Sequence, residues 1–287
     1  MIVIENVRDF DLDHIFDCGQ CFRWDRQKDG SYTGLVRGVP PANISLSRKG
    51  ALIIDGPDRK GLEEFWREYL DLDRDYGRVK DKLSENDPKM AEVIGCGEGI
   101  RILRQDPWET LITFIISQNN NIPRIKKCIN SLCENFGKPA GTYGDYEYFD
   151  FPDAEVLAGL TLDDLAVSKL GYRAEYIIET AKTIVEEGAN KLYSMKGAER
   201  EEAFAYLTGL HGVGPKVANC VLLFSLGKLD SFPVDVRICQ VMNRVYGIGL
   251  NDKRTMAEFA ASNFGEYGGV AQQYLYYFIK NTTTEGD

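Results

Sequence analysis

The sequence predicts an α+β fold, in which an N-terminal antiparallel β-sheet packs on a mainly α-helical body. Two observations carry this prediction. Two hairpin signals stand close together near the N-terminus, and from Asp106 onward apolar residues recur with the helical period almost to the end of the chain. We therefore expect a sheet domain over residues 1–105 and a helical domain over residues 106–287.

The predicted hairpins turn at Lys28-Asp29-Gly30 and at Arg48-Lys49-Gly50. On both sides of each turn, short runs rich in aromatic and branched residues have the composition of strands. These runs cover residues 22–24 and 32–36 for the first hairpin, and residues 43–46 and 52–54 for the second. An antiparallel sheet is the simplest arrangement for them.

The helices are predicted from spacing and from end signals. Residues 61–72 have one helical pattern, and Asp106-Pro107-Trp108-Glu109 supplies a cap, a first-turn proline and a reciprocal acid for a buried helix over residues 108–116. An amphipathic helix over residues 174–185 should end at Gly188. Similar patterns cover residues 199–207, 216–226, 236–246, 256–264 and 270–280.

Composition limits the class of protein. The chain has 287 residues, of which 44% are hydrophobic, so it can bury a substantial core. It has no apolar run of about eighteen residues and no signal-peptide pattern, so we expect a cytoplasmic protein. Seven scattered cysteines favour reduced thiols, and Cys18-x-x-Cys21 has no second pair to complete a zinc site. A net charge of -10 argues against general polyanion binding, so any contact with nucleic acid must be local.

The most informative segment is Leu210-His211-Gly212-Val213-Gly214-Pro215-Lys216-Val217-Ala218, which lies between two amphipathic helices. Gly212 and Gly214 allow a tight hairpin whose backbone N–H groups stand free at the start of the next helix and could bind one phosphate. An ordinary turn between two helices is the alternative. With the flanking helices, the pattern indicates a helix-hairpin-helix over about residues 199–226.

Lys216 and Asp235 are the candidate catalytic residues. Lys216 lies in the first turn of its helix, where the helix dipole disfavours an ammonium group, and a neutral amine there could form a Schiff base. A surface lysine that contacts phosphate is the alternative. Asp235, in Pro233-Val234-Asp235-Val236, could cap the next helix, stabilise a positive charge on a sugar and relay protons. The short connection between the two helices could bring both residues to one cleft.

These motifs resemble those of the helix-hairpin-helix superfamily of DNA glycosylases, and within it the 8-oxoguanine DNA glycosylase/AP lyases. The likeness covers most of the chain. Beside the hairpin and PVDV, it includes Cys-Gly-Gln-Cys-Phe-Arg-Trp at residues 18–24, Asn-Asn-Asn-Ile-Pro-Arg-Ile at 119–125, Leu-Gly-Tyr-Arg-Ala at 170–174 and Ala-Gln-Gln-Tyr-Leu-Tyr at 271–276. Four further matches in the right order are difficult to obtain by chance.

The resemblance implies a combined glycosylase and lyase acting on duplex DNA that contains 8-oxoguanine, preferably opposite cytosine. Lys216 would attack C1′ of the damaged nucleotide and carry the sugar as a Schiff base through β-elimination, while Asp235 would stabilise the cation-like sugar. Backbone carbonyls of Thr208, Leu210 and Val213 match positions that often hold a monovalent or calcium ion. No cofactor is required. The last cysteine is Cys239, so we expect no C-terminal iron-sulfur cluster.

The same resemblance implies a base pocket and a DNA-binding surface. The Gly19 carbonyl would distinguish the protonated N7 of 8-oxoguanine from the acceptor N7 of guanine, and Gln272 would read the Watson-Crick edge. Cys220 and Tyr276 would sandwich the purine. Enzymes of this kind flip the base out of the duplex, so a wedge must fill the gap. The residues implied in binding DNA are Tyr172 as the wedge, Arg173, Arg124 and Asn119 at the orphaned cytosine, and Gly212, Gly214 and Arg237 at phosphates.

Three positions depart from the family pattern. Tyr276 replaces phenylalanine, Arg237 replaces a phosphate-binding histidine, and Ile279 replaces an acidic residue near the base, which puts one base contact in doubt. Two other functions stay open: a glycosylase of the same fold for another damaged purine, and a non-catalytic helix-hairpin-helix protein that binds DNA. A monomer suits an enzyme that treats one lesion per encounter, and we expect it to act on DNA of the nucleoid.

Overall fold

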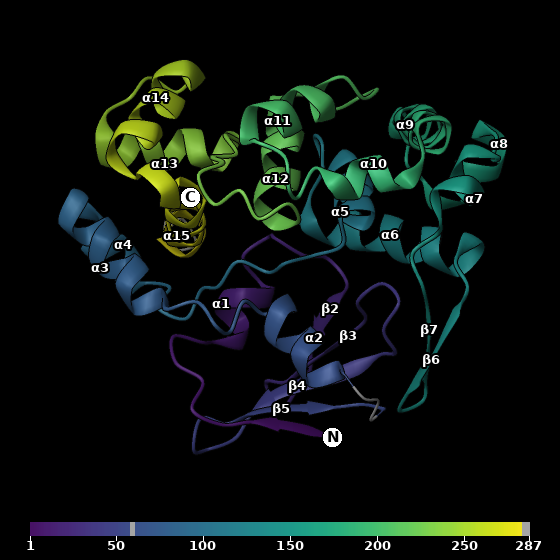
Figure 1. Cartoon of the computed structure of the whole chain (residues 1–287), viewed down its shortest axis with the longest axis horizontal. Helices are drawn as coiled ribbons and strands as arrows, with labels where there is room; N and C mark the ends of the chain where they lie inside the picture. Colours follow the sequence, from purple (N-terminus) through teal and green to yellow (C-terminus); the bar gives the residue numbers. More distant parts are fainter. Residues whose placement is uncertain (58–60, 283–287) are drawn as a thin grey trace.

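The computed structural model describes residues 1–57 and 61–282, so that the last five residues of the predicted second domain lie outside it. An N-terminal antiparallel sheet lies beneath a body made mostly of helices (Figure 1). This confirms the predicted α+β fold class. Within the described residues, no helix is both long enough and apolar enough to cross a membrane.

The sheet has five strands in the order β1-β5-β4-β3-β2, and all neighbours are antiparallel. Both predicted hairpins are confirmed. Gly30 and Gly50 have φ angles of 85° and 79°, the left-handed conformation that favours glycine in these tight turns. The strands are β1 (Ile2–Ile4), β2 (Trp24–Arg26), β3 (Tyr32–Gly34), β4 (Ala42–Leu46) and β5 (Leu52–Asp55).

The register of the sheet places its apolar residues on one face. Ile44 pairs with Tyr32 on one side and with Ile54 on the other, and all three side chains are buried. They pack against helices α1 (Leu12–Phe16) and α2 (Leu62–Tyr69) in a small core of their own. The aromatic rings of Trp24 and Trp66 meet edge to face in this core. Alternation along the strands therefore decides which face of the sheet is covered.

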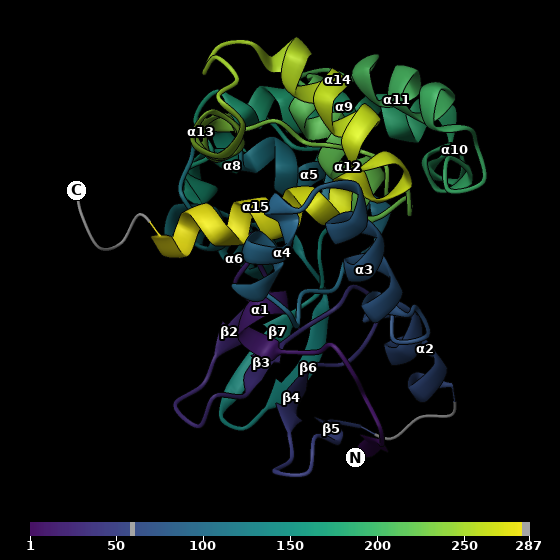
Figure 2. The ribbon, with the colours of Figure 1, turned by 90° about the vertical axis from the view of Figure 1, so that its left-hand side faces the viewer.

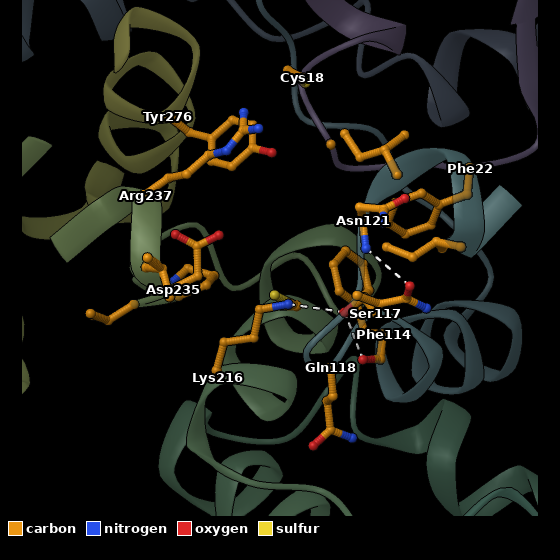
Figure 3. A pocket seen from close by; sticks show the side chains of 18 of the residues that line it. Cys18, Phe22, Phe114, Ser117, Gln118, Asn121, Lys216, Asp235, Arg237 and Tyr276 are labelled. Carbon is orange, nitrogen blue, oxygen red and sulfur yellow. Dashed lines mark hydrogen bonds between the residues drawn. The ribbon is translucent and has the colours of Figure 1, made fainter. Parts of the chain in front are cut away.

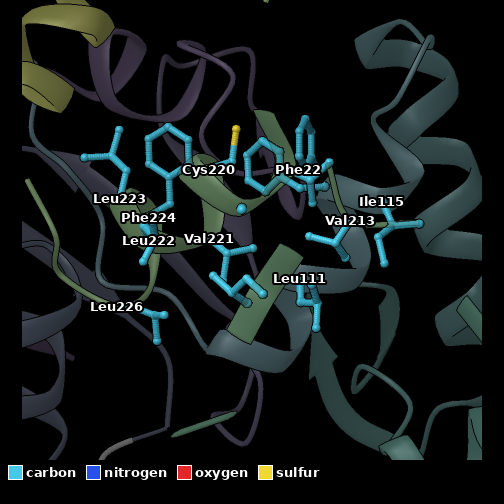
Figure 4. Close-up of a cluster of buried hydrophobic side chains, with 14 of the residues drawn as sticks. Phe22, Leu111, Ile115, Val213, Cys220, Val221, Leu222, Leu223, Phe224 and Leu226 are labelled. Carbon is cyan, nitrogen blue, oxygen red and sulfur yellow. The ribbon is translucent and has the colours of Figure 1, made fainter. Parts of the chain in front are cut away.

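The helical body encloses a second, larger core. Helix α5 packs against α12, and the apolar side chains of both helices fill the centre of the body (Figure 4). Helices α3 and α4 join the same core through α15, which runs across the body beside α4 (Figure 2). The remaining helices are α3 (Tyr76–Asn86), α4 (Lys89–Gly95), α5 (Pro107–Ile116), α6 (Ile122–Phe136), α7 (Ala154–Ala158), α8 (Leu162–Leu165), α9 (Arg173–Glu187), α10 (Ala189–Ser194), α11 (Arg200–Thr208), α12 (Pro215–Phe224), α13 (Val236–Tyr246), α14 (Lys253–Asn263) and α15 (Gly268–Thr282).

The end signals read from the sequence at the start of α5 and after α9 are confirmed, except for the role of Glu109. The Asp106 side chain accepts the backbone N–H of Glu109 at 2.9 Å, with Pro107 in the first turn, and Gly188 follows α9. The Glu109 carboxylate does not act as the predicted reciprocal cap but pairs with Arg23 at 3.4 Å. A further hairpin, formed by β6 (Pro139–Tyr143) and β7 (Tyr146–Phe149), was not predicted.

Candidate active site

A cavity of about 650 Å³ opens among the ends of α5 and α6, the first turns of α12 and α13, and one face of α15. The loop that follows α1 closes it from the side of the sheet domain. Eight of the residues singled out from the sequence line this cavity, although they come from five separate segments of the chain. They are Gly19, Asn119, Lys216, Cys220, Asp235, Arg237, Gln272 and Tyr276.

The fold of the hairpin places Lys216 at the wall of the cavity. Gly214 precedes α12 as its N-cap with extended backbone, and Pro215 opens the helix, so Lys216 is its second residue. The Lys216 ammonium nitrogen, Nζ, lies 3.0 Å from the Ser117 hydroxyl and 4.9 Å from the centroid of the Phe114 ring. Figure 3 shows the side chain reaching from α12 toward the end of α5.

Asp235 lies across the cavity from that contact (Figure 3) and is the N-cap of α13. Its Oδ1 accepts the backbone N–H of Ile238 at 2.8 Å, which fixes the side chain against the helix end. The predicted capping role is therefore confirmed. Capping occupies Oδ1, and the same side chain lines the cavity that Lys216 also lines.

Cys220 lies one helical turn after Lys216 and on the same face of α12, as the spacing predicts. Its side chain is buried, and burial raises the pKa of the thiol to about 11, although the nearby Lys216 opposes the shift. The thiol is therefore protonated at neutral pH and offers the cavity a small, polarisable, uncharged surface.

Gly19 and Tyr276 form the wall on the side of the sheet domain. Gly19 has a φ of 79°, and a Cβ atom at this position would lie 3.1 Å from the Tyr276 hydroxyl, so a side chain would crowd the ring. Burial raises the pKa of Tyr276 to about 12. The Arg237 guanidinium lies over the same ring, 5.3 Å from its centroid. Lys280 ties α15 to the loop before Gly19 by donating to the Asp17 carbonyl at 2.7 Å.

Gln272 is buried at the back of the cavity beside Gln273. The Gln273 amide donates to Gln272 Oε1 at 2.7 Å, which restrains the carboxamide that the sequence assigns to base recognition. Gln272 Oε1 keeps a second lone pair for a further donor.

Two of the other predicted DNA-binding residues, Tyr172 and Arg173, meet at the carbonyl of Gln118, which itself lines the cavity. Tyr172 is half exposed, and its hydroxyl contacts this carbonyl at 3.4 Å. Arg173 is buried and donates to the carbonyls of Gln118 and, at 2.9 Å, Asn119. Asn119 itself has a φ of 47°, which asparagine tolerates. Arg124, in the first turn of α6, is exposed and reaches the Lys169 carbonyl at 3.4 Å.

The hairpin is tied to the same region. Gly212 has a φ of 73° and packs on the ring of Tyr176, and its carbonyl accepts from the Gln118 side chain at 3.0 Å. Gly214 has open space around its Cα. The carbonyls predicted to hold an ion belong to Thr208, Leu210 and Val213; that of Leu210 accepts the Val213 N–H at 3.2 Å, which leaves it a second lone pair.

Sequence reasoning missed three cavity residues on α5 and just after it: Phe114, Ser117 and Gln118. Ser117 and Gln118 are the first polar residues after a strongly apolar helix, which is typical of a helix end and carried no functional signal. Their partners, Lys216 and Gly212, lie more than ninety residues later, and nothing in the sequence pairs them.

Comparisons with known proteins identify the family of this chain. The profile of the 8-oxoguanine DNA glycosylase N-terminal domain matches residues 2–111, and that of the HhH-GPD superfamily of base excision DNA repair proteins matches residues 112–265. An N-glycosylase/DNA lyase OGG1 of Arabidopsis thaliana is 32% identical, over 91% of this chain and 75% of the plant protein. An N-glycosylase/DNA lyase of Saccharomyces cerevisiae is 34% identical, over 84% of this chain and 69% of the yeast protein.

Solved structures give the same result over nearly the whole chain. The 8-oxoguanine glycosylase/lyase of Clostridium acetobutylicum, in complex with duplex DNA containing cytosine opposite 8-oxoguanine, is 39% identical with a TM-score of 0.92. The match covers 98% of this chain and 95% of the bacterial enzyme. The chain therefore belongs to the HhH-GPD superfamily of base excision DNA repair proteins, and its N-terminal part is the N-terminal domain of 8-oxoguanine DNA glycosylases.

Proposed function

We propose that the protein flips 8-oxoguanine out of duplex DNA, excises it, and nicks the strand by Schiff-base β-elimination. The observation that carries this function is the placement of Lys216 and Asp235 on one cavity, directly after a helix-hairpin-helix. The likeness to N-glycosylase/DNA lyases and to a glycosylase/lyase bound to DNA with cytosine opposite 8-oxoguanine supports it.

In the first step, Lys216 loses one ammonium proton to water, and the resulting amine attacks C1′ of the flipped nucleotide. A bond forms between Nζ and C1′ while the bond from C1′ to the base nitrogen breaks, and the base leaves with that electron pair and takes up a proton. Positive charge develops on the sugar as the bond breaks. The Asp235 carboxylate, fixed by the Ile238 N–H, is placed to stabilise that charge.

In the second step, the nitrogen loses a proton, the bond between C1′ and the ring oxygen O4′ breaks, and O4′ takes up a proton, which leaves a Schiff base between Nζ and C1′. Removal of a proton from C2′ then expels the 3′ phosphate, which breaks the strand, and water releases the sugar fragment from the lysine. Asp235 lines the same cavity as Lys216 and is our candidate for relaying these protons.

The base would be read by the residues at the cavity wall. The Gly19 carbonyl would accept the N7 hydrogen of 8-oxoguanine, Gln272 would bind its Watson-Crick edge, and Cys220 and Tyr276 would stack on its two faces. The protonated Cys220 thiol suits this role because an uncharged sulfur packs well on a ring.

The duplex would be held by the surface around Gln118 and the hairpin. Tyr172 would fill the space of the flipped base, Arg124 and Asn119 would face the orphaned cytosine, and Arg237 with the N–H groups near Gly212 and Gly214 would bind phosphates. Arg173 already donates to three backbone carbonyls, those of Gln118, Asn119 and Leu170, so to reach cytosine it must exchange one of them.

The proposal also covers an ion at the hairpin, the need for a cofactor, and the oligomeric state and location of the protein. Carbonyls of Thr208, Leu210 and Val213 would hold a monovalent or calcium ion that bridges the hairpin to a phosphate, and the free lone pair on Leu210 is compatible with it. No other cofactor is needed for the steps above. We expect a monomer that acts on nucleoid DNA in the cytoplasm.

Single-turnover nicking assays test the function. Duplexes would carry 8-oxoguanine opposite each of the four bases, beside an undamaged duplex. We expect nicking of the lesion strand that is fastest opposite cytosine and absent for undamaged DNA and for Lys216→Gln. Nicking only at another damaged purine would show that this other base, and not 8-oxoguanine, is the substrate. Lesion binding with no cleavage by the wild type would refute the catalytic function.

A further inference from the structure

We propose that Ser117 is a positioning residue for the Lys216 amine: its hydroxyl and the Phe114 ring hold the nitrogen so that the lone pair faces the cavity. This inference rests on the proposed function, because it assumes that Lys216 is the nucleophile. It adds a residue from α5, an element to which the sequence motifs assign no part in the chemistry.

The hydrogen bonds of the Ser117 hydroxyl show whether Ser117 or Lys216 donates in the contact between them. Ser117 follows the last residue of α5, and its hydroxyl donates to the Phe114 carbonyl at 2.8 Å. A serine hydroxyl has one proton, so Oγ can only accept from Lys216 Nζ, which lies 3.0 Å away. Figure 3 shows both contacts meeting at Ser117. Ser117 therefore cannot take a proton from the lysine and stay in this arrangement; it can orient the amine.

The Phe114 ring occupies a second side of the nitrogen. Nζ lies 4.9 Å from the ring centroid, within the range in which an ammonium group is attracted to an aromatic face. The ring cannot easily turn away, because it stacks on Phe224 with centroids 5.4 Å apart and meets Phe22 edge to face at 5.6 Å. All three rings belong to the buried core.

Three neighbours surround the nitrogen: the Ser117 hydroxyl, the Phe114 ring and the Cys220 thiol, with which Lys216 also forms a side-chain hydrogen bond. A neutral amine has a bond to carbon, two N–H groups and one lone pair. The Ser117 hydroxyl accepts one N–H and so limits how the nitrogen can turn, and we place the lone pair on the side of the cavity that Asp235 also lines. Without the Ser117 acceptor, the flexible lysine side chain could turn the lone pair away from C1′.

The two elements that carry donor and acceptor are also tied to each other. The residue after Ser117, Gln118, donates from its side chain to the Gly212 carbonyl at 3.0 Å, within the hairpin that leads into α12. The backbone N–H of Ser117 continues the helix by donating to the Thr113 carbonyl at 3.0 Å. These two hydrogen bonds hold the end of α5 against the hairpin and so fix the distance between Ser117 and Lys216.

The test compares Ser117→Ala with Ser117→Thr, which keeps the hydroxyl, and with Ser117→Val, which has the shape of threonine without it. Ser225→Ala is the matched control. Ser225 also follows the last residue of its helix, α12, and its hydroxyl donates back to the Val221 carbonyl at 2.7 Å, but it does not line the cavity. The readouts are the single-turnover excision rate on duplex DNA with 8-oxoguanine opposite cytosine, the yield of borohydride-trapped adduct, the Kd for that duplex, and the unfolding midpoint.

We expect Ser117→Ala and Ser117→Val to excise roughly 10- to 100-fold more slowly, with Kd changed by no more than about twofold, because the amine is misplaced while DNA binding is intact. Ser117→Thr should regain most of the rate, and Ser225→Ala should keep it. Wild-type rates in both Ser117→Ala and Ser117→Val would overturn the proposal, as would equal slowing in Ser117→Thr and Ser117→Val. A wild type that forms no adduct would instead refute the proposed function, and this role with it.

Discussion

Gly212→Ala tests how the hairpin is built. Gly212 has a φ of 73°, a region in which an L side chain costs about 1 kcal/mol. A Cβ atom there would lie 2.4 Å from Cγ of Tyr176, which is far inside van der Waals contact and forces the ring or the hairpin to move. Such overpacking costs about 1–3 kcal/mol. The free energy of unfolding should therefore fall by about 3 kcal/mol, which for a chain of this size lowers Tm by roughly 5 °C.

Gly214→Ala is the matched control, two residues away in the same hairpin. Its φ is -88°, and nothing lies within 4 Å of the added Cβ, so stability should change by less than about 1 kcal/mol. Both variants would be measured by thermal unfolding and by urea titration. If Gly212→Ala unfolds at the same midpoint as Gly214→Ala, the assignment of left-handed backbone and close packing at Gly212 is wrong.

Three further predictions concern the cavity and its support. Burial raises the pKa of Glu109 to about 7, although the charge of Arg23 opposes the shift, so between about pH 4.5 and 7 the folded state holds a proton that the unfolded state releases. The free energy of unfolding should therefore fall by about 3 kcal/mol as pH rises through that window. Urea titrations of the wild type and of Glu109→Gln at several pH values should show this difference. If both proteins have the same pH dependence, the buried carboxyl is not protonated. Burial raises the pKa of the Cys220 thiol to about 11, so at pH 8 this thiol should react with iodoacetamide at least tenfold more slowly than the exposed Cys96. Peptide mapping would measure both rates, and equal labelling would contradict the burial of Cys220. The substitution Gly19→Ala strains the backbone and pushes on Tyr276, so the ratio of cleavage at 8-oxoguanine to cleavage at guanine should drop at least tenfold. An unchanged ratio would show that Gly19 does not select the base.

The parts of the fold that depend on local signals were predictable from the sequence. The two hairpin turns, the Asp106 cap and the helix after Asp235 each have a cause within a few residues: a glycine with positive φ, a carboxylate that accepts a backbone N–H, or a regular apolar period. The β6–β7 hairpin was missed because its strands are short and mostly exposed, so they have no buried face to impose an alternation.

The same division holds for the site. Lys216, Cys220 and Asp235 are marked by their motifs, and the structure brings them to one cavity. The contacts that orient them join residues far apart in the chain, such as Ser117 with Lys216, and no local pattern reports such a pair. Glu109 is a case in which a local pattern gave a wrong prediction. Its position matches a capping box, but its carboxylate pairs with Arg23, which belongs to the sheet domain.

Borohydride trapping tests the central claim most directly. Wild type and Lys216→Gln would each be incubated with labelled duplexes that carry 8-oxoguanine or guanine opposite cytosine, reduced with borohydride, and the adduct mapped by peptide mass spectrometry. We predict one covalent adduct, formed by the wild type with the lesion duplex and located at Lys216. An adduct at another residue, an equal adduct with Lys216→Gln, or none with wild type that binds the lesion duplex would contradict the assignment of Lys216 as the nucleophile.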